Sequence, residues 1–134
     1  MDQSELKEVI DTEVFTTWLD EPGICRTVVK KNDVIGLVEA RGNSLAVRKI
    51  SGDKLRPLLV DIREIKSIDK PARDHFAMHG RQAGVCAIGM LIRSPLSKVI
   101  GNFFLGINRP PVPTRLFNSE AKALDWLRKF IIKS

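Results

Sequence analysis

Six charged or hydroxyl residues stand where predicted strands end and a predicted helix begins: Asp61, Arg63, Arg93, Ser94, Ser97 and Lys98. The carboxyl ends of parallel strands meet at one edge of a sheet, where ligands of such folds usually bind. The N–H groups at the start of a helix also attract anions. These residues are therefore a candidate pocket for an anion or small ligand. The plainer interpretation is a capped helix and an ion pair of Asp61 with Arg93 or Arg63.

The helix that follows contains a second candidate, a contact surface. Ser94 is a typical N-cap residue, and Pro95 suits the first helical position. Apolar residues then recur at helical spacing and predict one buried stripe, made of Leu96, Val99, Ile100, Phe103, Phe104 and Ile107. Leu105 is expected to point away from that stripe, and one exposed leucine needs no special explanation. The alternative is an interface with a partner or second subunit that comprises Gly101, Leu105, Gly106 and Arg109.

Metal binding and catalysis have little support in the sequence. His75 and His79 are spaced to share one face of a helix, but there is no obvious third ligand, and packing is the default for His79. The chain has no G-x-S-x-G, P-loop or G-x-G-x-x-G motif and no paired carboxylates beside a strand end. We therefore expect no enzymatic activity, no metal and no cofactor.

The composition is that of an ordinary soluble globular protein, with 43% hydrophobic and 28% charged residues in 134. We expect one domain over residues 1–134, in which 1–12 is a frayed end or the start of a strand. The longest apolar run, 85–92, is too short to cross a bilayer, and no signal peptide is evident, so a cytoplasmic protein is expected. Cys25 and Cys86 are expected to be reduced thiols. The net charge of +6 comes from scattered basic residues, which makes nucleic-acid binding unlikely.

Turn and cap residues divide the chain into alternating strands and helices. The predicted strands are 13–19 and 24–29, joined by a turn at 20–23 into a hairpin, then 58–62, 85–92 and 114–117, with 34–38 a further possibility. The predicted helices are 37–50, 70–79 after Asp69, the helix after Ser94, and one capped by Asn118. Run 85–92 is the most continuously apolar and is expected at the sheet centre. The order predicts an α/β fold with a mixed sheet of about five strands and about four helices.

Parts of this pattern resemble a known family. The strand 58–63, the block from Ser94 to Phe117 and the closing segment 123–127 are similar to small bacterial STAS/SEC14-like (SpoIIAA-like) domains, most of which are uncharacterised. The resemblance covers residues 13–132 and implies their α/β fold. It also implies two kinds of function. STAS anti-sigma-factor antagonists bind a protein partner and are switched by phosphorylation of a Ser or Thr, and SEC14-type relatives hold lipids.

The phosphorylation position departs from the pattern of that resemblance. Asp69 matches the family's aspartate, but the acceptor position falls on Lys70 or Pro71, neither of which has a hydroxyl group. Ser67 lies close by and would need a shifted alignment. The leading hypothesis is a non-catalytic module that binds a protein partner or itself. The alternatives are a small-ligand, lipid or anion-binding protein and, third, a basic nucleic-acid-binding domain.

Overall fold

The structure is a computed structural model that describes residues 8–20, 23–30, 34–52, 54–78, 84–106 and 112–131. Its strands are β1 (Val9–Asp11), β2 (Phe15–Asp20), β3 (Ile24–Val29), β4 (Val34–Ile35), β5 (Arg56–Asp61), β6 (Ser67–Ile68), β7 (Val85–Leu91) and β8 (Thr114–Phe117). Its helices are α1 (Leu37–Ser51), α2 (Lys70–Met78), α3 (Pro95–Leu105), α4 (Glu120–Leu127) and the short 3₁₀ turn η3 (Arg128–Phe130).

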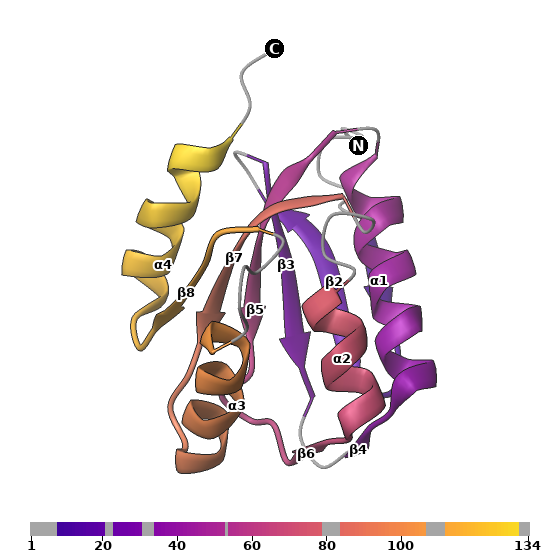
Figure 1. Cartoon of the computed structure of the whole chain (residues 1–134). Helices are drawn as coiled ribbons and strands as arrows, with labels where there is room; N and C mark the ends of the chain where they lie inside the picture. Colours follow the sequence, from indigo (N-terminus) through magenta and orange to yellow (C-terminus); the bar gives the residue numbers. More distant parts are fainter. Residues whose placement is uncertain are drawn as a thin grey trace.

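A six-stranded mixed sheet forms the middle of the molecule (Figure 1). Its strand order is β1-β2-β3-β5-β7-β8. β1, β2 and β3 pair antiparallel, whereas β3, β5, β7 and β8 run parallel. β4 and β6 form a separate parallel pair, and each lies just before the first residue of a helix, α1 and α2 respectively. The parallel half therefore brings the ends of β5 and β7 to the same edge of the sheet.

The helices cover the two faces of the sheet unequally. Side chains of successive strand residues point to opposite faces. Leu58 packs with Val47 and Ile50 of α1, whereas its neighbour Leu59 packs with Leu127 of α4. Residues of α1, α2 and α3 share one core cluster, so these three helices lie on one face. α4 lies on the other face, beside β7 and β8 (Figure 1).

A buried polar network attaches α1 to the β2–β3 hairpin. The hydroxyl groups of Thr17 and Thr27 lie 2.9 Å apart across the two strands. The side-chain amide of Asn43 in α1 donates a hydrogen bond of 2.9 Å to the Thr17 hydroxyl. Burying polar groups is tolerated when they bond to one another. This explains how a helix with few large apolar residues still packs closely on the sheet.

The predicted fold class is confirmed: the structure is α/β with a mixed sheet and four α-helices, including the predicted hairpin. The main sheet has six strands, against about five predicted, because β1 extends it. Two details were wrong. β7 is not central, since β3 and β5 are the middle strands, and it is apolar because helices cover both its faces. The cap of α4 is Ser119 rather than Asn118, and its hydroxyl accepts the Lys122 N–H.

The predicted buried stripe of α3 was also wrong. Ile100 is buried, but Leu96, Val99 and Phe103 are 40%, 67% and 38% exposed. The side chain of Phe104 and all of Ile107 lie outside the described residues. The helix is rotated because its small residues, Ser97 and Gly101, face the sheet. α3 ends at Leu105, ahead of the predicted stop at Asn108, which lies outside the described residues.

Candidate functional site

Asp61 and Arg63 form a bidentate ion pair at the end of β5. The Arg63 guanidinium donates to both carboxylate oxygens of Asp61, at 3.0 and 2.7 Å, and the Arg63 backbone N–H donates to the same carboxylate. Burial opposes ionisation of Asp61, but the hydrogen bonds and charge of Arg63 outweigh it, so the pKa of Asp61 lies below its ordinary value. The carboxylate is therefore engaged within the chain and bonds its own loop.

The hydroxyl groups at the start of α3 are engaged in the same way. Ser94 caps the helix by accepting the Ser97 N–H at 3.0 Å. The Ser97 hydroxyl donates to the Ser94 carbonyl and accepts the Arg93 N–H. The Arg93 guanidinium pairs with Glu64 at 2.6 Å. Of the six residues predicted to form a pocket, Lys98 alone has no side-chain hydrogen bond or ion pair with the described residues.

We expect phosphate to raise the melting temperatures of the wild-type protein and of Lys98→Ala equally. The hydroxyls and Arg93 are already bonded within the chain, and the nearby Asp61 carboxylate repels an anion. Thermal denaturation with and without phosphate measures this. Lys122→Ala is the matched control, because Lys122 also lies in the first turn of a helix capped by serine. A shift lost only in Lys98→Ala would contradict this expectation and favour the predicted anion pocket.

The lowered pKa of Asp61 predicts an acid-dependent stability. The folded chain holds the Asp61 proton less tightly than the unfolded chain, so the stabilisation is present above the unfolded pKa and is lost as the pH falls below about 4. Asp61→Asn should cost about 1 kcal/mol at neutral pH and flatten this decline. Urea unfolding near neutral pH and near pH 3 tests it, with the exposed Asp125→Asn as control. If the free energy of unfolding of Asp61→Asn falls with acid as much as that of the wild type, Asp61 is not the source of the acid dependence.

The four residues of the predicted interface do not form one exposed surface. Gly101 is buried, and a Cβ at that position would lie 2.9 Å from Cδ2 of Leu116. Leu105 is 44% exposed, as expected. Gly106 is exposed and ends the helix, its N–H donating to the Asn102 carbonyl. Arg109 lies outside the described residues. Gly101 thus serves the close packing of α3 on β8.

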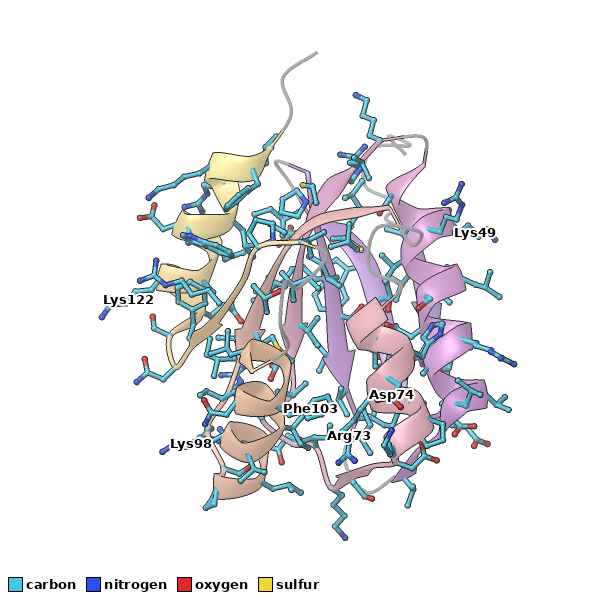
Figure 2. All side chains as sticks on the ribbon, in the orientation of Figure 1. Lys49, Arg73, Asp74, Lys98, Phe103 and Lys122 are labelled. Carbon is cyan, nitrogen blue, oxygen red and sulfur yellow. The ribbon has the colours of Figure 1, made fainter. Side chains whose placement is uncertain are left out.

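The exposed apolar surface of α3 lies elsewhere, along Leu96, Val99 and Phe103, which we call the α3 stripe. The sequence pattern showed that these residues belong to one side of the helix but placed that side in the core. On the α2 side, the guanidinium carbon of Arg73 lies 5.1 Å from the centre of the Phe103 ring. Figure 2 shows Arg73 and Phe103 together between α2 and α3. No sequence pattern indicates this contact between α2 and α3.

The remaining candidates have structural partners or lie outside the described residues. His75 Nε2 lies 2.8 Å from the Ser44 hydroxyl of α1, and His79 lies outside the described residues. Asp69 caps α2 by accepting the Ala72 N–H, which places Lys70 and Pro71 in the first turn. Within the described ranges, no three His, Cys, Asp or Glu side chains are grouped to hold a metal ion. No helix in these ranges is long and apolar enough to span a membrane.

Comparison with known proteins places this fold in a family. The model of the "Domain of unknown function (DUF7793)" family matches residues 17–131. A solved structure, an uncharacterized protein of the DUF3478 family with a SpoIIAA-like fold from Shewanella loihica PV-4, is similar with a TM-score of 0.55. The two chains are 14% identical, and the match covers 91% of this chain and 92% of that one, so the likeness shows the fold alone.

A protein with unknown function from Arthrobacter sp. FB24 is 36% identical, covering 88% of this chain and 95% of its own, with a TM-score of 0.34. No curated protein matches the chain. The resemblance to SpoIIAA-like domains is thus confirmed for the fold. Because one family model spans most of its length, this chain belongs to the DUF7793 family and has a SpoIIAA-like fold.

Proposed function

We propose that this chain is a non-catalytic, STAS-like regulatory module that acts by binding a protein partner. The observation that carries the proposal is the α3 stripe. Val99 is 67% exposed, and the less exposed Leu96 and Phe103 lie on the same side of the helix. Adjacent exposed apolar side chains on one surface often mark a site of interaction, whereas isolated ones do not. The SpoIIAA-like fold supports this choice by analogy.

The state of the strand-end residues also supports binding over catalysis. The Asp61 carboxylate and the Ser94 and Ser97 hydroxyls are the groups at this edge that resemble catalytic groups. All three bond to neighbouring atoms of the chain and stabilise the loop and the helix cap. A general base or nucleophile needs its reactive atom available to a substrate. These three groups therefore hold the loop after β5 and the N-terminus of α3 in place, and they are not available to a substrate.

The proposal predicts that Val99→Asp abolishes partner capture. A carboxylate in the middle of a buried apolar contact loses its hydration, so we expect at least a tenfold loss of affinity, about 1.4 kcal/mol. Affinity capture from a lysate of the source organism, with the chain immobilised, measures this by quantitative mass spectrometry. Leu45→Asp is the matched control, because Leu45 is 69% exposed on α1. Equal capture by wild type and both variants would contradict the proposal.

Native mass spectrometry of the purified protein tests the main alternative. The proposal predicts the mass of the bare chain or of a multiple of it. A small molecule retained at a fixed ratio would contradict the proposal and favour the ligand-binding alternative. If the retained molecule is also lost in Lys98→Ala, the strand-end residues are its site. A multiple that dissociates in Val99→Asp would identify the partner as a second copy.

A further inference from the structure

Arg73 is an arginine whose side chain lacks a polar partner among the residues that the structure describes. It lies in the first turn of α2, half-buried, with its guanidinium over the Phe103 ring. Its Nε atom is buried and has no hydrogen-bond partner in the described part of the chain. No carboxylate among the described residues pairs with its guanidinium. Burying an unpaired donor costs free energy. The side chain is only half-buried, so the rest of its guanidinium, which has no carboxylate partner in these ranges, suits an acceptor that comes from outside the chain.

The charges around Arg73 leave the surface positive. The acidic side chains from β5 to α2 are already engaged: Asp61 with Arg63, Glu64 with Arg93, Asp69 with the α2 backbone, and Asp74 with Lys70. This segment lies beside α3, because its residues Ile65 and Ala72 share a core cluster with Ile100. Among the described residues from 61 to 98, three cations have no acidic partner, namely Lys66, Arg73 and Lys98. Figure 2 shows Arg73 and Lys98 on either side of α3.

We propose that the α3 stripe binds an acidic amphipathic helix of a partner protein. Apolar side chains of that helix cover Leu96, Val99 and Phe103, and a carboxylate beside them pairs with Arg73. The three stripe residues extend over two turns, about 10 Å, a length that suits the apolar face of a packed helix. This inference rests on the proposed function and specifies the chemistry of the partner.

Charge favours this occupant over a second copy of the chain. The whole chain carries a net charge of +6, and Arg73 and Lys98, which have no acidic partner among the described residues, lie beside the stripe (Figure 2). A symmetric dimer through this surface would bring the same residues of both copies together, Arg73 among them. Like charges brought together in an interface oppose binding, whereas opposite charges favour it and speed association. A helix with acidic residues beside its apolar face matches both the exposed apolar side chains of this surface and its positive charge.

Selection from a displayed library of helical peptides of about 15 residues tests the inference. The library has one apolar face and random charges on the flanking positions. We expect enriched peptides to carry Asp or Glu beside the apolar face. Val99→Asp should weaken them at least tenfold, and Leu45→Asp should not. Arg73→Glu should also weaken them at least tenfold. Arg41→Glu, which makes the same change of net charge on α1, should alter affinity less than about twofold.

Each contrary result has a defined meaning. Enriched peptides that are neutral or basic, or equal losses in Arg73→Glu and Arg41→Glu, would overturn the acidic helix and leave the proposed function standing. Peptides insensitive to Val99→Asp would remove the α3 stripe as the site. A selection that enriches no peptide also overturns the inference. In that case, Val99-dependent dimerisation, or Val99-dependent binding to phosphatidylcholine–phosphatidylglycerol vesicles, identifies a second copy or a membrane as the occupant.

Discussion

Leu127→Ala should lower the free energy of unfolding by about 2–5 kcal/mol. Leu127 is fully buried, and it packs against Ile24, Leu59 and Leu91 from three neighbouring strands. Removing its side chain loses apolar burial and leaves a cavity between α4 and the sheet. The backbone of Gly89 lies directly beneath this leucine, so little can move to fill the space. Urea unfolding followed by circular dichroism measures the change.

Leu105→Ala is the matched control for that substitution. Leu105 is also a helical leucine, but it is 44% exposed, and we expect its loss to cost less than about 0.5 kcal/mol. A loss for Leu127→Ala as small as that of Leu105→Ala would mean that α4 does not cover this face of the sheet.

Gly101→Val should destabilise the protein by about 1–3 kcal/mol, because the added side chain overpacks the contact between α3 and β8. A Cβ at this position would lie 2.9 Å from Leu116 Cδ2 and 3.3 Å from Ile92 Cγ2. Valine adds two further methyl groups that must displace these neighbours. Thermal and urea unfolding measure the loss, and the near-ultraviolet spectrum of the folded state reports any repacking.

Gly42→Val makes the same substitution where nothing surrounds the new side chain. Gly42 lies on the exposed side of α1, and a Cβ there would meet no atom within 4 Å. Valine is a better helix former than glycine, so we expect a gain of a few tenths of a kcal/mol. If Gly101→Val gains stability as Gly42→Val does, α3 is rotated relative to this structure and Gly101 faces solvent.

The sequence predicted the parts of the fold that local chemistry determines. Ser94 and Asp69 were correctly identified as helix caps because side-chain capping depends only on the next three residues. The β2–β3 hairpin and the parallel strand β5 were visible from turn residues and apolar runs. The rotation of α3 was not predictable in the same way. Its apolar residues cover much of the helix surface, and the small residues Ser97 and Gly101 decided which side approaches the sheet.

In the candidate site, too, contacts between residues close in the sequence were predictable, and contacts between distant residues were not. An ion pair of Asp61 with Arg63 was one of two pairs that the sequence allowed, and the turn after β5 selected it. Arg93 instead meets Glu64, a residue distant in the chain, which no local pattern indicates. Arg73 was missed altogether, because a single arginine in the first turn of a helix is usually solvated. Its position over Phe103 and its unpaired Nε become evident only when α2 and α3 are placed together.

Photo-crosslinking in cells of the source organism tests the central claim, that the α3 stripe is a partner-binding surface. A photoreactive benzoylphenylalanine replaces Val99 in one variant and the equally exposed Leu45 in the other. We predict a discrete crosslinked species, containing the chain and one partner protein, from position 99 and none from position 45. The same products from both positions, or none from position 99, would contradict the claim.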